Sequence, residues 1–130
     1  VWVVGGPSER ALAAEIVAKG GAKVRDLTGT DLRTAILALA AARLAISNDS
    51  GLMHVAAAIG TPTIGIFGPT SPWHWAPLNP LAAVVQPPAL RGTQMPYHSI
   101  AARTDESYIR AIPPADVVEV ATTLLARPAA

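Results

Sequence analysis

Short apolar blocks alternate along this chain with longer stretches in which apolar residues recur at helical spacing. The blocks, each ended by glycine, proline or polar residues, predict strands at 1–4, 22–27, 44–47, 63–67 and near 82–85. The helical stretches predict helices from Ser8 to about residue 20, from Thr30 or Asp31 to about 43, over 51–60, and from Pro114 to about 126. This alternation predicts an α/β fold whose parallel sheet is covered by helices on both faces.

Polar or glycine-rich turns follow four of these strands. They are Gly5-Gly6-Pro7, Thr28-Gly29-Thr30, Asn48-Asp49-Ser50-Gly51 and Gly68-Pro69-Thr70. Ligands of parallel sheets bind beyond the carboxyl ends of the strands, so we expect the four turns to gather along one edge. The third turn opens helix 51–60, where unpartnered N–H groups and the helix dipole favour a phosphate. We therefore predict a phosphate site at Ser50 and Gly51.

Charge is scarce around this turn. Between Arg43 and Arg91 the only formally charged residue is Asp49. Helix 51–60 has no charged side chain, which predicts that no face of it is built for open water. A lone carboxylate beside a buried helix start has to be hydrogen-bonded or functional, because an unpaired buried charge is costly.

Composition excludes several classes of protein. The 130 residues fit one domain, with 51% hydrophobic and 15% charged residues. A net charge of +1 gives no case for a nucleic-acid partner. The absence of cysteine excludes disulfides and thiolate metal sites, and fits an intracellular compartment. No apolar run is long enough for a transmembrane segment and no signal peptide is visible. Prolines between 68 and 103 predict loops there, and the missing initiator Met suggests a fragment.

Two ordered blocks resemble the signature of the bacterial lipopolysaccharide heptosyltransferases, glycosyltransferase family 9. The first block is Asn48-Asp49-Ser50-Gly51-Leu52-Met53-His54-Val55-Ala56-Ala57-Ala58 with Gly60-Thr61-Pro62, and the second is Phe67-Gly68-Pro69-Thr70-Ser71-Pro72. Weaker similarity extends from residue 1 to about 125. The resemblance implies a Rossmann-like domain over 1–130, the C-terminal, nucleotide-sugar-binding half of a two-domain GT-B enzyme.

The resemblance also implies a donor site. In it Ser50, Gly51 and His54 receive the diphosphate of ADP-heptose and stabilise the leaving group, while Asp49 accepts hydroxyls of the sugar or ribose. Gly29 and Thr30 meet the adenine, and Ser8 and Glu9 meet the ribose. The predicted substrate-binding set is Ser8, Glu9, Gly29, Thr30, Asp49, Ser50, Gly51, Leu52, His54 and Thr70. No cofactor or metal is expected, because His54, His74 and His98 lack ligand spacing and GT-B enzymes work without metal.

Each of these residues also has an ordinary structural interpretation. Ser50 can be a plain N-cap, Asp49 a turn residue and His54 a satisfied core histidine. Thr70 and Ser71 can belong to a proline-framed turn, and Gly29-Thr30 and Ser8 can cap helices. The Trp73-His74-Trp75 run either packs under a long loop or contacts an absent domain or the acceptor; the resemblance assigns it nothing.

The predicted function is therefore transfer of heptose from ADP-heptose to the lipopolysaccharide inner core. The catalytic base and the site for the lipid A-core acceptor are expected in an N-terminal domain absent here, and the family's phosphate-binding lysine upstream of Val1. The chain alone is expected to be inactive, and the full enzyme to be cytoplasmic and peripheral to the inner membrane. Two alternatives stay open: another GT-B enzyme, such as a UDP-sugar transferase or an epimerase, and a non-catalytic nucleotide-binding module.

Overall fold

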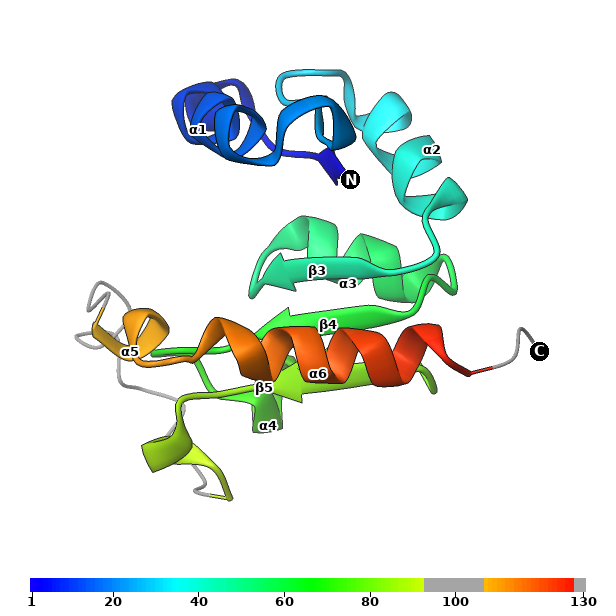
Figure 1. Cartoon of the computed structure of the whole chain (residues 1–130). Helices are drawn as coiled ribbons and strands as arrows, with labels where there is room; N and C mark the ends of the chain where they lie inside the picture. Colours follow the sequence, from blue (N-terminus) through cyan, green and yellow to red (C-terminus); the bar gives the residue numbers. More distant parts are fainter. Residues whose placement is uncertain (93–106, 128–130) are drawn as a thin grey trace. The chain divides into compact units, whose positions relative to one another are not determined.

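A computed structural model describes residues 1–92 and 107–127 (Figure 1). The chain forms two compact units, Val1–Ala41 (unit 1) and Ala42–Ala130 (unit 2). Each unit has its own parallel sheet flanked by helices, which confirms the predicted α/β fold class. The prediction that all the turns share one edge is therefore assessed within each unit.

In unit 1 two short strands pair in parallel, and the helix α1 lies between them in the sequence. These elements are β1 (Trp2–Val3), η1 (Pro7–Glu9), α1 (Arg10–Gly20), η2 (Gly21–Lys23) and β2 (Arg25–Asp26), followed by α2 (Leu32–Ala41). The strand predicted over 22–27 is shorter because the chain leaves α1 through Gly21, at φ 60°, and a 3-10 turn that Val24 N–H closes on the Gly21 carbonyl. Ala13, Thr28 and Ala35 are buried in this unit.

The two turns of unit 1 meet at one edge, as predicted for parallel strands. The Gly29 N–H donates to the Gly5 carbonyl at 2.9 Å. Asp26 and Asp31 stabilise the second turn and the start of α2. Hydrogen bonds from the Thr28 hydroxyl and then the Thr28 N–H lower the pKa of Asp26, and those from the Thr34 N–H and then its hydroxyl lower the pKa of Asp31. Asp31 is therefore the α2 cap, one of the two candidates that the sequence offered.

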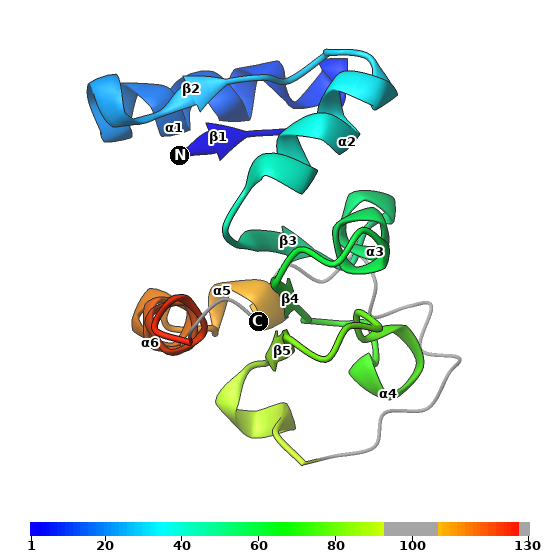
Figure 2. The same ribbon diagram turned by 90° about the vertical axis from the view of Figure 1, so that its right-hand side faces the viewer.

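In unit 2 the three strands form one parallel sheet in the order β3-β4-β5, with bounds Ala45–Asn48, Thr63–Ile66 and Ala82–Val85. Figure 2 shows α6 (Pro114–Leu125) on one side of this sheet and α3 (Gly51–Ala58) on the other. The core under α6 consists of Ile64, Val85, Ile112 and Leu124. On α6, Val117, Val120 and Ala121 pack against this core, whereas Val118 and Leu125 are exposed.

The proline-rich stretch contains more helix than predicted. Besides the expected strand β5, it holds α4 (Pro72–Trp75) and η3 (Pro88–Leu90). Proline at the first position of each explains the difference, because proline there fixes a helical φ without removing a needed donor. The helix α5 (Ser107–Arg110) follows, and its Ile109 lies where a Cβ on Gly68 would have to go. The predicted loop residues 93–103 lie outside the described part of the chain.

Asn79 connects the chain after α4 to the end of α3. Its Nδ2 donates to the carbonyls of Ala57 and Thr61, at 3.1 Å each, and its Oδ1 accepts the Leu81 N–H at 2.7 Å. Asn79→Ala removes all three of these hydrogen bonds. The Ala57 and Thr61 carbonyls keep the Gly60 N–H and the Thr63 hydroxyl as donors, but the Leu81 N–H loses this acceptor, so we expect the free energy of unfolding of unit 2 to fall by about 1–3 kcal/mol. Urea denaturation measures this. Asn79→Asp, which keeps only the acceptor, should fall between; equal stability of all three would contradict the assignment.

Candidate functional site in unit 2

The carboxyl end of β3 leads directly into the N-terminus of α3. Asn48 ends the strand, Asp49 and Ser50 make the turn, and Gly51 begins the helix. Ser50 is the N-cap residue, with an extended backbone at φ −150° and ψ 166°. The first intrahelical contact is the Met53 N–H donating to the Ser50 carbonyl at 3.1 Å. This arrangement presents the first N–H groups of α3 at the edge of the sheet where the sequence predicted an anion site.

The Ser50 side chain does not cap the helix. It makes no hydrogen bond to the N–H groups of α3; its Oγ lies 3.2 Å from the Oγ of Ser47, which itself donates to the Asn48 carbonyl at 2.9 Å. Because Ser50 is exposed, its hydroxyl and the helix N–H groups both face solvent. Ser50 therefore occupies the N-cap position but does not make the side-chain hydrogen bond of an ordinary N-cap.

Gly51 is not required by packing within the chain. A Cβ built on it would meet no atom within 4 Å, and its φ is not in the left-handed region. By contrast, a Cβ on Gly65 in the sheet below would approach the Met53 Sδ at 2.9 Å. Glycine at position 65 thus has a structural reason, whereas at position 51 the space above the backbone is open to a ligand.

His54 and Asp49 lie at the mouth of this site. The His54 Nε2 is 3.9 Å from the Asp49 Oδ1, which is too long for a hydrogen bond. The His54 side chain is 44% exposed and that of Asp49 is 19% exposed, so His54 is not a core histidine. His54 follows Ser50 by four residues, about one helix turn, and both residues are exposed.

The prediction that α3 has no face for water is wrong. Met53, Ala56 and Ala57 are buried, but Gly51, His54, Ala58 and Ile59 are exposed. The residues on this exposed face are small or uncharged. The sequence therefore gave no sign that the face meets water, and the lack of charge was interpreted as burial. Leu52 is half-buried beside it, and Thr70, beyond the end of β4, is also half-buried. Ser71 is buried at the N-cap of α4, and its hydroxyl has no hydrogen-bond partner among the described residues.

In unit 1 the predicted nucleoside residues already have local partners. The Thr30 hydroxyl donates to the Leu27 carbonyl at 2.9 Å, and the Glu9 Oε2 accepts the Gly6 N–H at 2.7 Å. Ser8 lies inside η1 and Gly6 occupies its N-cap position, so the predicted capping role of Ser8 is wrong. The physical reason is Pro7, which starts the helical turn one residue earlier. Ser8 and Glu9 remain exposed at this edge.

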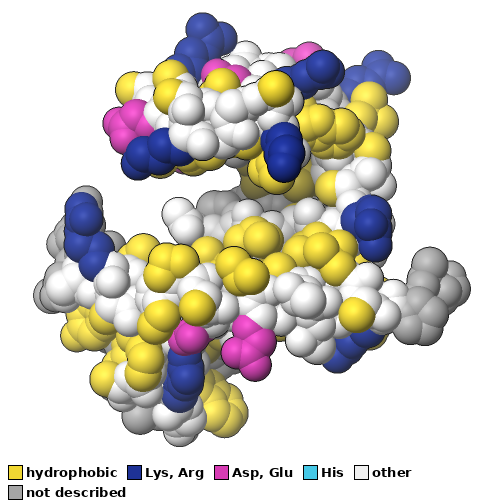
Figure 3. Space-filling view, in the orientation of Figure 1, with side chains coloured by type: hydrophobic (Ala, Val, Ile, Leu, Met, Phe, Trp, Pro, Cys, Tyr) yellow, Lys and Arg dark blue, Asp and Glu magenta, His cyan; other side chains and the backbone are white. Residues whose placement is uncertain are grey.

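Charge is distributed unevenly over the described surface. Figure 3 shows uncharged side chains over most of the visible face of unit 2, with a few charged ones below α6. The ion pair Arg91–Asp116 belongs to that part of unit 2.

Across residues 1–92 and 107–127, no group of three or more His, Cys, Asp or Glu could hold a metal ion. No helix in the same ranges is long and apolar enough to cross a membrane.

These features define a class: an α/β protein with parallel strands and an open helix N-terminus at the carboxyl edge of its sheet, as in proteins that bind nucleotide phosphates. A family model narrows the class. Residues 1–97 match glycosyltransferase family 9 (heptosyltransferase), and the chain belongs to this family.

Relatives and solved structures agree with this assignment. The chain is 44% identical over 63 residues to lipopolysaccharide heptosyltransferase 2 of Salmonella typhimurium, and equally to that of Escherichia coli; each match covers 48% of this chain and 18% of the relative. It matches the structure of E. coli ADP-heptose lps heptosyltransferase II with TM-score 0.73 and 31% identity, and a family 9 glycosyl transferase from Veillonella parvula with TM-score 0.79 and 26% identity. These matches cover 96% and 95% of this chain but 36% of each structure, so the chain spans about a third of their length.

Proposed function

We propose that this chain is the donor-binding part of a glycosyltransferase that moves heptose from ADP-heptose to the lipopolysaccharide inner core. Family membership and the similarity to lipopolysaccharide heptosyltransferases support the reaction class. One observation carries the assignment of the site, namely the start of α3. There the Ser50 hydroxyl makes no hydrogen bond to the first N–H groups of the helix, and no packing contact requires Gly51 to be glycine. This is a suitable receptor for a diphosphate.

In the proposed mechanism, unit 2 stabilises the leaving group. As the bond between the anomeric carbon and the diphosphate oxygen breaks, negative charge grows on the ADP that departs. The N–H groups of Gly51 and Leu52, the Ser50 hydroxyl and the His54 imidazole donate to the diphosphate oxygens as that charge develops. The Asp49 carboxylate can only accept hydrogen bonds when ionised, so we assign it to hydroxyls of the sugar or ribose and not to phosphate.

The rest of the reaction is assigned to protein outside this chain. We propose that the catalytic base and the acceptor site lie in an N-terminal domain, and that neither a metal nor a cofactor takes part. Because the acceptor is a lipid, the full-length enzyme would work at the surface of the inner membrane. Binding assays with ADP and UDP test the donor assignment: preference for UDP would favour a different GT-B enzyme, and binding of neither would overturn the proposal.

Gly51→Ala separates ligand binding from folding. The added methyl enters space that no protein atom occupies, so we expect unfolding to be unchanged or more costly by about 0.5–1 kcal/mol, since alanine favours helix over glycine. The same methyl crowds the proposed diphosphate, so affinity for ADP should fall about tenfold or more, or about 1.4 kcal/mol. Calorimetric titration and thermal unfolding of the same sample measure both. Gly21→Ala is the control. A Cβ on Gly21 would also meet no atom within 4 Å, but its φ of 60° disfavours alanine, so this variant should lose stability without a change in ADP affinity.

A further inference from the structure

Arg10 of unit 1 has an unusual position for an arginine. It is the first residue of α1, and its side chain crosses to the Gly29 turn. The guanidinium Nη2 and Nε lie 2.6 and 2.8 Å from where a Cβ of residue 29 would be, and Cζ lies 3.1 Å away. Since Cζ is farther than both nitrogens, the Nε–Nη2 edge points at Gly29 and the two flat faces of the guanidinium do not rest on the turn. Gly29, at φ 72°, leaves the space for it.

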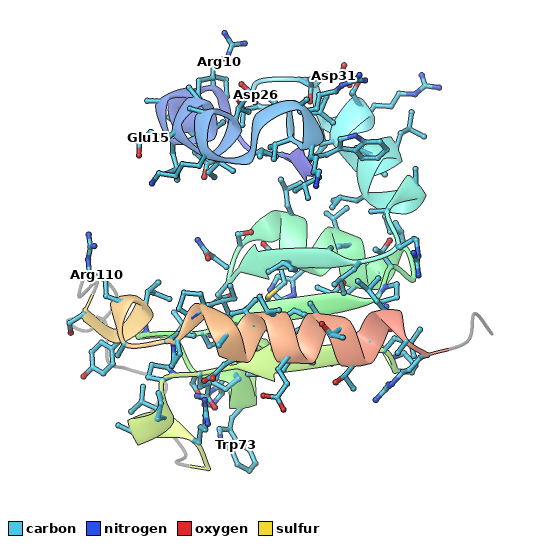
Figure 4. All side chains as sticks on the ribbon, in the orientation of Figure 1. Arg10, Glu15, Asp26, Asp31, Trp73 and Arg110 are labelled. Atoms are coloured by element: carbon cyan, nitrogen blue, oxygen red, sulfur yellow. The ribbon has the colours of Figure 1, made fainter. Side chains whose placement is uncertain are left out.

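This placement gains little stability from its surroundings. A cation in the first turn of a helix is repelled by the helix dipole. After the two hydrogen bonds from Thr28, the positive charge of Arg10 also lowers the pKa of Asp26, but across the described residues the guanidinium makes neither a hydrogen bond nor an ion pair. Figure 4 labels Arg10 and Asp26 on the same edge of unit 1, but the Asp26 Oδ1 instead accepts the N–H and hydroxyl of Thr28, at 2.7 Å each. Arg10 is therefore an exposed planar cation whose edge points at Gly29 and whose two faces make no hydrogen bond or ion pair with the described residues.

We propose that Arg10 stacks on the nucleobase of the donor nucleotide and is a further binding residue of this protein, an inference that rests on the proposed function. Guanidinium groups stack on aromatic rings through cation–π attraction and planar contact. The neighbourhood favours a neutral ring over a phosphate, because the carboxylates of Glu9 and Asp26 lie at the same edge and would repel an anion. Thr30 of the neighbouring turn is exposed, as Arg10 is, although Thr28 is buried and Gly29 is half-buried.

The test uses two ligands that separate the base from the phosphates. The 130-residue chain is labelled with ¹⁵N and titrated with adenosine and, separately, with pyrophosphate, while amide and Arg Nε–H signals are followed. Arg10→Ala should weaken adenosine binding about fivefold to tenfold, and Arg10→Lys, which keeps the charge but loses the plane, about threefold. Pyrophosphate binding should not change. Arg33→Ala, an exposed arginine on α2, is the matched control and should alter neither.

Thermal unfolding distinguishes a binding role from a structural one. Arg10→Ala should unfold at nearly the same temperature as the unmodified chain, because it removes both the repulsion from the helix dipole and the attraction to Asp26, which oppose one another. Unchanged adenosine affinity in Arg10→Ala, or the absence of adenosine-induced shifts in unit 1 of the unmodified chain, would overturn the inference. If pyrophosphate also failed to shift signals at residues 50–54, the proposed function would fail; if pyrophosphate shifted them normally, only the role of Arg10 would be rejected.

Discussion

Replacing His54 with alanine is expected to lower the turnover number of the full-length transferase about 10²-fold. The imidazole is exposed beside the N-terminus of α3, and its Nε2 is not hydrogen-bonded to Asp49. In the proposed mechanism this leaves the imidazole able to donate to a diphosphate oxygen as the bond between the anomeric carbon and the diphosphate breaks. A donor that acts mainly when charge develops changes the turnover number more than the Michaelis constant, so we expect the latter for ADP-heptose to change less than fivefold. Steady-state kinetics with varied donor concentration measure both.

Two further variants sharpen this test. His54→Asn keeps a side-chain donor and should retain more activity than His54→Ala. His74→Ala removes another exposed histidine of unit 2, on α4, and should leave turnover within twofold. Since the His54 side chain is 44% exposed and is not one of the core residues, unfolding of His54→Ala should be close to that of the unmodified protein. A loss of turnover that is equal in the His54 and His74 variants would reject leaving-group stabilisation by His54.

Much of unit 2 was predictable because its elements depend on local patterns. The apolar blocks that became β3, β4 and β5 pair in parallel, and Ala82–Val85 coincides with the strand expected there. Short buried strands of a parallel sheet are apolar on both faces, so a run of such residues between turn signals identifies them. The start of α3 was predictable for a similar reason, since a polar turn followed by helical periodicity fixes the N-terminus of a helix.

The errors have a common cause: the sequence does not say which uncharged residues meet water. The α3 face that carries Gly51, His54 and Ala58 has no charge, so it resembled a buried face, yet it is exposed. The short helix at Pro72–Trp75 was missed because proline was taken only as a helix breaker. In that helix Trp73 is 65% exposed, so the interpretation that it packs under a loop is wrong for this side chain.

Arg10 was missed because its signal is three-dimensional. In the sequence it is one of several charges in the first turn of a predicted helix, where Glu9 and Arg10 occur together. Only the fold brings it to Gly29, nineteen residues later, through the parallel pairing of β1 with β2 and the bond from the Gly29 N–H to the Gly5 carbonyl. A cation at a helix start, followed later by a glycine in a strand-terminal turn, is the weak sequence pattern that would have drawn attention to it.

The largest expected effect on folding is that of Phe67→Ala. Phe67 directly follows β4, is fully buried, and its N–H donates to the Val85 carbonyl at 2.9 Å. Its ring packs so closely on the sheet that a Cβ on Gly65 would lie 2.7 Å from its Cε2. Truncation removes the transfer free energy of the ring and leaves a cavity in a rigid sheet, so we expect unit 2 to lose about 3–5 kcal/mol of stability. That is a large share of the roughly 5–15 kcal/mol that stabilises a typical domain.

Urea denaturation followed by tryptophan fluorescence measures this loss. A Trp2→Phe background silences unit 1, so that Trp73 and Trp75 report on unit 2 alone. Phe67→Leu fills part of the cavity and should lose less than Phe67→Ala. Val118→Ala truncates a side chain that is 63% exposed and should stay within about 0.5 kcal/mol of the unmodified chain. If Phe67→Ala and Val118→Ala had the same urea midpoint, the buried Phe67 ring would not stabilise the packing of unit 2 at the end of β4.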